Sequence, residues 1–474
     1  MNPLQKEYPE IQSLFDQQSI TAHQWKSSKQ SERSQRLKKL RTWISSHQKE
    51  IQNVLWEDFK KPPLETDLSE IYPVTSEINH TLKNLGKWMR TKSIDTPLNM
   101  VGTKSYILPE PKGRSLIISP WNYPFNLSIG PLVSALAAGC PTIIKPSELT
   151  PATSNLIDQM IKDLFDPSEV SVVLGGAEVA QALLSLPFDH IFFTGSPKVG
   201  KIVMESASKH LTSVTLELGG KSPTIITESA DVADAARKIA FGKFVNCGQT
   251  CVAPDYILVH ESKFELVLAE LKLFIRDMYD PRHQGIELSK DLARIINFRH
   301  FTRIKRLLDD ALEKGVKLEF GGHSDEKDNY IEPTLLSGIN SIMNVFEEEI
   351  FGPILPITPY KNLQECIELI NSKPKPLALY IFDQSKQHLE ILEKTSSGNV
   401  VINDCVLHFL HQNLPFGGVG NSGLGKSHGH AGFLAFSHEK GVLKQRIGLN
   451  NVSFLRPPYG KTAKKIVDSL IKWF

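Results

Sequence analysis

Hydrophobic residues recur at helical spacing along the first 90 residues of the chain. The run from Ser31 to Phe59 places apolar residues three and four positions apart, with charged residues between them. The run from Ser69 to Met89 continues this pattern. Such periodicity is typical of amphipathic helices that bury one face. We therefore predict a mainly helical N-terminal region.

Short β-type runs dominate from residue 103 onward. The stretch from Thr103 to Ser119, punctuated by Pro109, Pro111 and Gly113, predicts a strand, a turn and a second strand. Apolar runs alternate with helical stretches, and these runs are "SLIIS", "PTIIKP", "VSVVLGG", "HIFFTGS", "SVTLEL", "SPTIIT" and "DYILVH". This alternation indicates βαβ units around a mostly parallel sheet, and hence an α/β fold.

A long stretch between Arg114 and Lys145 carries no charged residue. A membrane-spanning helix needs about 20 continuous apolar residues. The segment "SPWNYPFN" interrupts this stretch with two prolines and two asparagines. We predict a strand, a loop, a helix and a strand in a buried α/β core, and no transmembrane segment.

Length and composition limit the class of protein. A chain of 474 residues is too long for one ordinary core, so we expect two or three domains. The pattern of strands and helices restarts after Gly219-Gly220, which is the natural boundary. A net charge of +2 gives no basis for nucleic-acid binding. Five cysteines make no disulfide framework, and the start "MNPLQKEYPEIQ" lacks the apolar core of a secretory signal, so we expect a cytoplasmic protein.

A glycine-bearing turn joins an apolar strand to a helix in "IFFTGSPKVGKIV". Backbone amides at a helix N-terminus attract phosphate. The turn lacks the third glycine of a dinucleotide fingerprint, and Ile202 stands where a nucleotide-triphosphate loop needs Ser or Thr. Taken alone, the pattern fits a phosphate site or a plain tight turn equally well.

Two further motifs offer chemistry. In "LELGGKSP", Glu217 ends an apolar strand and is either a surface residue or, if burial raises its pKa, a general base. In "VNCGQTC", Cys247 and Cys251 lie four residues apart. A zinc site would need a second ligand pair, which is not nearby, so we expect no metal. Buried thiols, or one nucleophile supported by an amide donor such as Asn122, remain open.

Taken together, these motifs resemble those of the NAD(P)-dependent aldehyde dehydrogenases, in the order found in that family. The matching segments run from about Lys112 to Gly425 and are "SPWNYPFNL", "AAGCPTIIKPSE", "FFTGSPKVG", "LELGGKSP", "VNCGQTCVAP", "EEEIFGP" and "LPFGGVGNSG". The segments "NYPFNL", "CVAPDYILVH" and "KPLALYIF" are most similar to the class 3 branch, which includes fatty and aromatic aldehyde dehydrogenases.

The resemblance implies a covalent mechanism for oxidising aldehydes to carboxylic acids. Cys251 matches the nucleophile that forms a thiohemiacetal and then a thioester. Asn122 matches the side-chain donor to the oxyanion, and Glu217 matches the base that activates water for hydrolysis. By the same resemblance, the substrates would be medium- or long-chain aliphatic aldehydes or aromatic aldehydes.

The resemblance also implies a cofactor site for NAD, with NADP as an alternative. The matching residues are Trp121, Lys145, Glu148, Gly195, Ser196, Gly200, Leu218, Glu349 and Phe351. Tyr123 would contact the substrate. The acidic Glu148 would repel a 2′-phosphate, which favours NAD. Pro197 and Lys198 alter the middle of the phosphate turn, but that turn needs only backbone amides.

The fold implied by the family has a Rossmann-like cofactor domain, an α/β catalytic domain and a small β bridging and oligomerisation element. We assign residues 1–90 and 113–217 to the cofactor domain and residues 218–425 to the catalytic domain. Residues 91–112 and 426–450 form the bridging element, and residues 451–474 a C-terminal tail. A homodimer is the class 3 expectation.

Other function classes remain as rivals. In a coenzyme-A-acylating relative a thiol would release the product, and Glu217 argues against it because hydrolysis is the step that needs a base. A nucleotide-triphosphate hydrolase or a non-enzymatic scaffold is a rival of another class. The set of Cys251, Glu217 and Asn122 favours the aldehyde dehydrogenase.

Two features fall outside the family pattern. The tail places Ile466, Leu470 and Phe474 at helical spacing among lysines, which indicates a helix docked on its own dimer, a lid over the substrate entrance, or a membrane-surface contact. Cys247 stands where relatives often have a small residue. We expect it to trap an oxidised Cys251 as a disulfide under peroxide, provided the Cα atoms lie roughly 4.4–6.8 Å apart.

Overall fold

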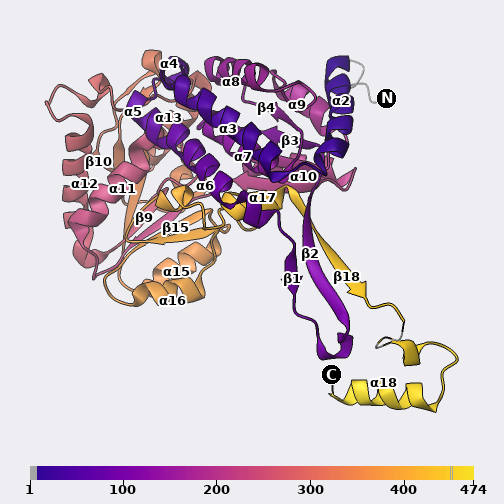
Figure 1. Ribbon diagram of the computed structural model, residues 1–474. Helices are drawn as coiled ribbons and strands as arrows, with labels where there is room; N and C mark the ends of the chain where they lie inside the picture. Colours follow the sequence, from indigo (N-terminus) through magenta and orange to yellow (C-terminus); the bar gives the residue numbers. More distant parts are fainter. Residues whose placement is uncertain (1–7, 449, 451, 474) are drawn as a thin grey trace.

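The computed structural model describes residues 8–448, 450 and 452–473 (Figure 1). The N-terminal region is helical, as predicted, and its elements are α2 (Pro9–Trp25), α3 (Gln30–Ser46), α4 (Gln48–Phe59), α5 (Pro63–Thr66), a π-helical turn (Asp67–Ile71) and α6 (Tyr72–Trp88). Their periodic apolar residues are buried; Leu37, Leu40 and Ile44 are fully inaccessible to solvent. Of these helices, α3, α4 and α6 pack on one side of the first sheet, whereas the start of α2 packs on the other side.

The first sheet has six strands in the described part of the chain, in the order β17-β7-β6-β3-β4-β5. All neighbours are parallel except β17 and β7. The strands are β3 (Ser115–Ile118), β4 (Thr142–Lys145), β5 (Val170–Val172), β6 (His190–Gly195), β7 (Ser213–Leu218) and β17 (Gly423–Leu424).

Helices cover both faces of this sheet because its strands are apolar on both sides. They are α7 (Asn126–Ala138), α8 (Pro151–Leu164), α9 (Ala177–Leu184) and α10 (Pro197–Ser208). Ile117 and Ile144 face the core beneath α7 and α8. Their neighbours Leu116 and Ile143 face a separate core beneath α2, α9 and α10. The charge-free stretch thus forms the predicted strand, loop, helix and strand.

The second sheet begins after the chain passes Gly219-Gly220, where the sequence pattern restarts. Its described strands follow the order β10-β13-β14-β9-β8-β15-β16, and only β10 and β13 are antiparallel neighbours. These strands are β8 (Pro223–Ile226), β9 (Tyr256–His260), β10 (Lys317–Phe320), β13 (Thr334–Ser337), β14 (Ile354–Tyr360), β15 (Ala378–Phe382) and β16 (Asn399–Ile402).

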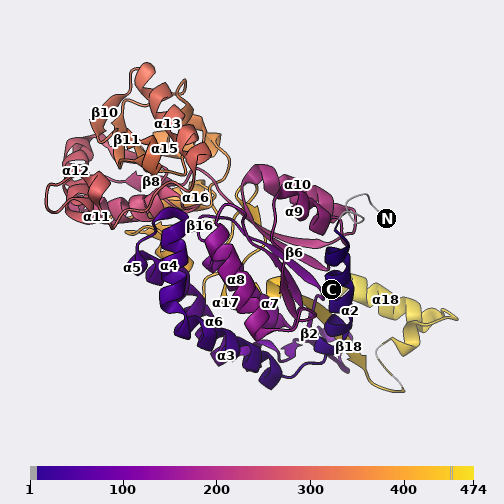
Figure 2. The same cartoon turned by 90° about the horizontal axis from the view of Figure 1, so that it is seen from above.

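The helices of this second unit lie beside its sheet, and Figure 2 shows the unit next to the first one. They are α11 (Val232–Phe244), α12 (Phe264–Tyr279), α13 (Phe298–Glu313), α14 (Asn344–Glu347), α15 (Leu363–Ser372) and α16 (Gln387–Lys394), with a small hairpin of β11 (Ser324–Asp325) and β12 (Tyr330–Ile331). The carboxyl ends of β6 and β7 face this unit, the usual place for a ligand in an α/β sheet.

A three-stranded antiparallel arm projects from the body (Figure 1). It joins β1 (Lys92–Ile94), β2 (Thr103–Pro111) and β18 (Ser437–Gln445). The preceding helix α17 (Gly429–Ala435) packs on α6 and α7, so the arm itself resumes at Ser437 and not at residue 426. The two predicted strands of 103–119 exist, but they belong to different sheets.

The tail forms α18 (Lys461–Trp473), which lies beyond the end of the arm in Figure 1. Ile466 and Leu470 are half-buried on this helix, and Phe474 lies outside the described residues. No described helix has the length and apolar character needed to cross a bilayer.

Candidate active site

The loop that carries the predicted nucleophile leaves α11 in a constrained conformation. Asn246, Cys247 and Gly248 all have positive φ, at 54°, 54° and 74°. A Cβ at Gly248 would lie 2.3 Å from the carbonyl oxygen of Gly352, so glycine is required there. This bend turns the chain so that Cys251 faces the space between the two sheets.

The buried amide of Gln249 fixes this loop. Its Nε2 donates to the carbonyls of Asn246 at 3.1 Å and Arg294 at 3.0 Å. Its Oε1 accepts from the backbone N–H of Ile296 at 3.0 Å. The residue has no solvent exposure, and all these bonds are therefore made in a low dielectric.

Asn122 lies beside this loop although it follows β3 in the other sheet. Its Nδ2 donates to the carbonyl of Gln249 at 3.0 Å, and its own carbonyl accepts from Asn246 Nδ2 at 2.8 Å. Asn122 is buried and lines a cavity together with Cys251. Two reciprocal bonds thus hold the predicted oxyanion donor against the predicted nucleophile.

The Cys251 thiol is partly exposed and lies in an acidic environment. Burial, and then the carboxylates of Glu349 and Glu217, raise the pKa of Cys251 to about 12. The backbone N–H groups of Cys251 and Val252 act in the opposite direction. The protein alone therefore keeps this sulfur protonated at neutral pH, and a cationic neighbour would be needed to form the thiolate.

Glu217 ends β7 and is buried, so it is not the surface residue that the sequence left open. Its Oε1 accepts from Ser427 Oγ at 2.9 Å. Burial raises the pKa of Glu217 to about 8, partly offset by the bond from Ser427. A carboxyl group with this pKa, lining the same cavities as Cys251, is suited to act as a base near neutral pH.

A cavity of about 260 Å³ leads from the turn between β6 and α10 to Cys251. Its lining includes the predicted residues Trp121, Asn122, Gly195, Ser196, Leu218, Glu349 and Phe351. The described lining does not include Lys145, Glu148 or Gly200. Lys145 and Glu148 instead form an ion pair of 2.7 Å after β4, and a Cβ at Gly200 would lie 2.7 Å from Leu218.

A larger apolar cavity of about 460 Å³ opens on another side of Cys251. Most of its lining is hydrophobic and comes from the N-terminal helices, α11, α12 and the loop after β16, including Leu64, Leu68, Phe241, Met278, Val406, Leu407 and Phe409. Tyr123 also lines it, and its hydroxyl lies 2.6 Å from Thr250 Oγ1. The ammonium group of Lys61 lies 3.9 Å from the centre of the Tyr123 ring.

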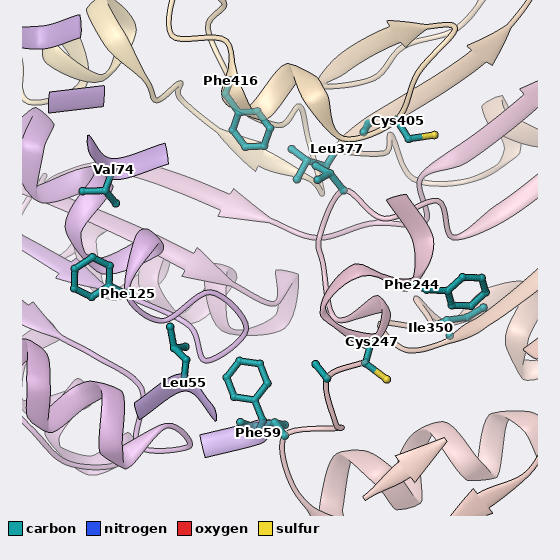
Figure 3. Close-up of a cluster of buried hydrophobic side chains, with 14 of the residues drawn as sticks. Leu55, Phe59, Val74, Phe125, Phe244, Cys247, Ile350, Leu377, Cys405 and Phe416 are labelled. Carbon is teal, nitrogen blue, oxygen red and sulfur yellow. The ribbon is translucent and has the colours of Figure 1, made fainter. Parts of the chain in front are cut away.

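Cys247 points away from these cavities. Its side chain is buried in the main hydrophobic core, where Figure 3 shows it with Phe244 and Ile350. All five cysteines are free thiols. The charged groups around Cys247 are Arg294, Glu65 and Lys243, which differ from those around Cys251. The crosslink expected under peroxide stays a prediction.

Comparison with known proteins assigns the family. Residues 6–442 match the model of the aldehyde dehydrogenase family. The 4,4'-diaponeurosporen-aldehyde dehydrogenase of Staphylococcus aureus is 46% identical over 90% of this chain and 92% of its own. Aldehyde dehydrogenase family 3 member A2 of Rattus norvegicus is 43% identical over 91% of this chain and 88% of its own. The chain belongs to the aldehyde dehydrogenase family.

Solved structures agree with this assignment. The substrate-bound state of Staphylococcus aureus AldH matches with a TM-score of 0.92 and 43% identity, covering 97% of this chain and 99% of that one. A Mycobacterium tuberculosis aldehyde dehydrogenase complexed with NAD+ matches with a TM-score of 0.81 and 28% identity, covering 90% and 87%. The resemblance to class 3 and the predicted fold class are confirmed, and this protein is an NAD(P)-dependent aldehyde dehydrogenase.

The residues of this aldehyde dehydrogenase fit a dinucleotide in the cavity of about 260 Å³. Ser196 caps α10 by accepting from the Val199 N–H; Pro197 has no N–H, so the backbone N–H of Lys198 is the first that this helix offers to a phosphate. A Cβ at Gly219 would lie 2.5 Å from Glu349 Oε2, so glycine makes the space that this carboxylate occupies. Trp121 and Phe351 meet edge to face with their ring centroids 5.4 Å apart.

Side chains from other parts of the chain hold Glu349 in place, and of the three described here only Lys221, in "LELGGKSP", lies in a family motif. Arg303, on α13, donates to the carbonyls of Glu349 at 3.2 Å and Ile350 at 2.6 Å. Lys221 is 2.5 Å from Asp255 Oδ2 and donates to the Glu348 carbonyl at 2.8 Å. His300, also on α13, stacks obliquely on Trp121 at 4.7 Å, and burial lowers its pKa to about 4. The helix that carries Arg303 and His300 contains no family motif, so only the fold reveals these two residues.

The acidic surroundings of Cys251 lead to a direct prediction. Without cofactor, iodoacetamide should alkylate Cys251 much more slowly at pH 7 than it alkylates an ordinary thiol, because little thiolate is present. Glu349→Gln removes a negative charge and should accelerate alkylation several-fold. Mass mapping of the labelled peptide measures the rate, with the exposed Glu50→Gln as control. Fast alkylation of the parent protein would contradict this electrostatic picture.

Proposed function

We propose that this aldehyde dehydrogenase oxidises apolar aldehydes to carboxylic acids through a covalent intermediate on Cys251. The observation that supports this most strongly is the meeting of Cys251, Asn122 and Glu217 where the cavities join. A nucleophile, an oxyanion donor and a base within one enclosed space are the parts that acyl transfer to water requires.

In the first half-reaction Cys251 reacts as the thiolate, after its proton has passed to solvent water, and the sulfur attacks the aldehyde carbon to form a thiohemiacetal. The Asn122 amide and the Cys251 backbone N–H stabilise the oxyanion, because both are fixed before the substrate arrives and need no reorganisation. Glu349 and Phe351 would hold NAD in the adjoining cavity, where it would supply the acceptor for the hydride that leaves the substrate carbon. What remains on Cys251 is a thioester.

In the second half-reaction, Glu217 removes a proton from water as the water attacks the thioester carbonyl. The carbon–sulfur bond breaks and Cys251 is released. The bond from Ser427 orients the Glu217 carboxylate, and burial keeps its proton affinity high enough to act as a base. This step distinguishes the proposal from a coenzyme-A-acylating enzyme, in which no base for water is needed.

The apolar cavity supports a substrate with a long aliphatic or aromatic body. Its volume of about 460 Å³ suits such a group better than a short polar aldehyde. Burial of each methylene contributes about 0.8 kcal/mol to binding, so chain length should govern affinity. Tyr123, at the end of this cavity nearest Thr250, is the proposed contact for the atoms next to the carbonyl.

We propose NAD as the preferred cofactor. By the motif, Lys145 and Glu148 are the positions that bind the adenosine ribose. Because Lys145 is paired with Glu148, its charge is not free to bind a 2′-phosphate.

We also propose a cytoplasmic location, because a catalytic thiol must stay reduced to work.

A homodimer assembled through the arm is part of the same proposal. Among the described residues β18 is an edge strand of its sheet, and the arm exposes large apolar side chains at Leu98, Val101, Leu443 and Ile447. Exposed apolar residues beside a free strand edge favour association with a second copy. In a dimer, the tail helix of one subunit would extend over its partner.

Glu217→Gln tests the two-step mechanism. The variant should still release about one NADH per active site in a burst, and then turn over about a hundredfold more slowly, because only hydrolysis needs the base. In the parent protein, hydrolysis should increase as the pH rises through about 8, where Glu217 loses its proton, and the variant should lack this dependence. Cys251→Ala is the control that should give neither burst nor turnover. Equal loss of burst and steady state in Glu217→Gln would contradict the proposal.

Leu64→Trp tests the apolar cavity. Leu64 lines it, and the side chain is largely exposed, so the larger ring is tolerated by the fold but narrows the entrance. We expect kcat/KM for dodecanal to fall about tenfold while that for propanal changes little. Leu211→Trp, at another highly exposed leucine, is the matched control. An equal effect on both aldehydes would place the substrate elsewhere.

Truncation after Pro458 tests the tail. If α18 serves the substrate entrance, losing it should reduce kcat/KM for long-chain aldehydes several-fold more than for short ones. Sedimentation of the truncated protein shows whether the dimer persists. A uniform loss for all chain lengths, or none, would eliminate a lid and leave only a docking role.

A further inference from the structure

A second buried carboxylate, that of Glu77, lines a small cavity together with Glu217. Glu77, on α6, is only 4% exposed, and its Oε1 accepts from the backbone N–H of Gly429 at 2.7 Å. Its other oxygen, Oε2, is buried and has no hydrogen-bond partner among the described residues. Glu77 belongs to no family motif, and the mechanism above gives it no part. A buried carboxylate with an unsatisfied oxygen needs a reason.

The space between the two carboxylates is a small cavity of about 60 Å³. Glu77, Thr194 and Glu217 line it, and each has one buried oxygen that lacks a partner in the described structure, namely Glu77 Oε2, Thr194 Oγ1 and Glu217 Oε2. A volume of this size holds a few water molecules, each of which needs two to four polar partners. Water in this cavity would lie beside the side chains that carry these oxygens, along a passage that begins at the predicted base.

One short segment of chain holds both ends of this passage. Ser427 Oγ donates to Glu217 Oε1 at 2.9 Å and lies 3.0 Å from His428 Nδ1. Gly429 then donates its N–H to Glu77. His428 and Gly429 both have positive φ, at 69° and 50°, and a Cβ at Gly429 would lie 2.0 Å from the Gln412 carbonyl. The backbone of this segment therefore adopts an uncommon conformation, and in it Ser427 bonds Glu217 while Gly429 bonds Glu77.

We propose that Glu77 accepts, through water in this cavity, the proton that Glu217 removes from the hydrolytic water. The inference rests on the proposed role of Glu217. As the water oxygen bonds to the thioester carbonyl and the carbon–sulfur bond breaks, Glu217 becomes a carboxylic acid. Its proton then passes to a cavity water, that water gives a proton to Glu77 Oε2, and Glu217 regains its negative charge for the next turnover. Glu77 loses the proton to solvent past Gln412, which lines the outer wall and bonds partly exposed Ser76.

The pKa values of the two carboxyl groups allow this proton transfer. Burial raises the pKa of Glu77 to about 7 and that of Glu217 to about 8, so the proton moves between groups of similar affinity. The other titratable groups near the passage are His428 on the linking segment, His80 one turn along α6, Lys426 and His411. Burial lowers the pKa of His428 to about 4, so this ring is neutral and serves Ser427 as a hydrogen-bond partner.

An activated ester isolates the relevant step. 4-Nitrophenyl acetate acylates Cys251 without any hydride transfer, so hydrolysis of the acyl-enzyme is measured apart from the oxidation step. NAD is present throughout, to offset the acidic surroundings that suppress the thiolate in its absence. In Glu77→Gln, the burst of nitrophenol should be unchanged, whereas the steady-state rate should fall about tenfold, because Glu217 sheds its proton slowly. High concentrations of imidazole buffer should restore the rate, since with NAD in the cofactor cavity a small base can still enter from the substrate side and take the proton from Glu217. Glu77→Asp should recover part of it.

Controls separate this inference from a loss of fold and from the role of Glu217. Asp67→Asn makes the same acid-to-amide change one segment earlier, where Asp67 accepts from Gln52 at 2.8 and 2.9 Å, and should behave as the parent. Thr194→Val removes a cavity oxygen at constant volume and should also slow the steady state, which decides the matter if Glu77→Gln does not fold. Normal steady-state rates in the folded variants, or slowing without buffer rescue, would overturn the relay alone. A fast steady state in Glu217→Gln would overturn the proposed function and the relay together.

Discussion

The geometry of the site depends on the buried amide of Gln249. Its side chain joins the nucleophile loop to the segment around Arg294 and Ile296. Its backbone carbonyl accepts a hydrogen bond from the Asn122 side-chain amide, which follows a strand of the other sheet. Each of these groups is buried, so leaving one unpaired would cost roughly 1–3 kcal/mol. The relative position of the two sheets is thereby fixed at the atoms where reaction is proposed. A displacement of either unit would break several bonds at once, which keeps Asn122 and Cys251 in register.

The same enclosure makes the site strongly acidic. Glu217 and Glu349 both raise the pKa of the Cys251 thiol, and burial raises the pKa of the carboxyls themselves. Low dielectric strengthens each repulsion, so an arrangement of a thiol among carboxyls resists ionisation while the cofactor is absent. An oxidised nicotinamide ring carries positive charge and would offset this repulsion. The protein's own charges therefore couple reactivity of the sulfur to the presence of the cofactor.

Local sequence patterns predicted the strands and helices more completely than the long-range contacts between them. Each apolar run between Ser115 and His260 is a strand, because alternating burial on two faces leaves a local signature. The motifs also indicated Cys251, Asn122 and Glu217, which carry distinctive neighbours. Arg303 and Glu77 could not be found in this way. Arg303 acts on a backbone carbonyl 46 residues away and Glu77 on an N–H 352 residues away, and neither contact imposes a pattern on the surrounding sequence.

The three cavities that Cys251 lines differ in how strongly their lining residues are constrained by the rest of the fold. The cofactor cavity and the small cavity behind Glu217 are bounded by strand ends and by bonds to the backbone, so substitutions there disturb elements that hold the chemistry. The apolar cavity is bounded by side chains of helices and loops, such as Leu64, Phe241 and Leu407, of which none takes part in the Gln249 network. Its shape can therefore change without moving Asn122 or Cys251. The aldehyde body is consequently the part of the reaction that this scaffold leaves most free to vary, while the carbonyl chemistry stays fixed by buried hydrogen bonds.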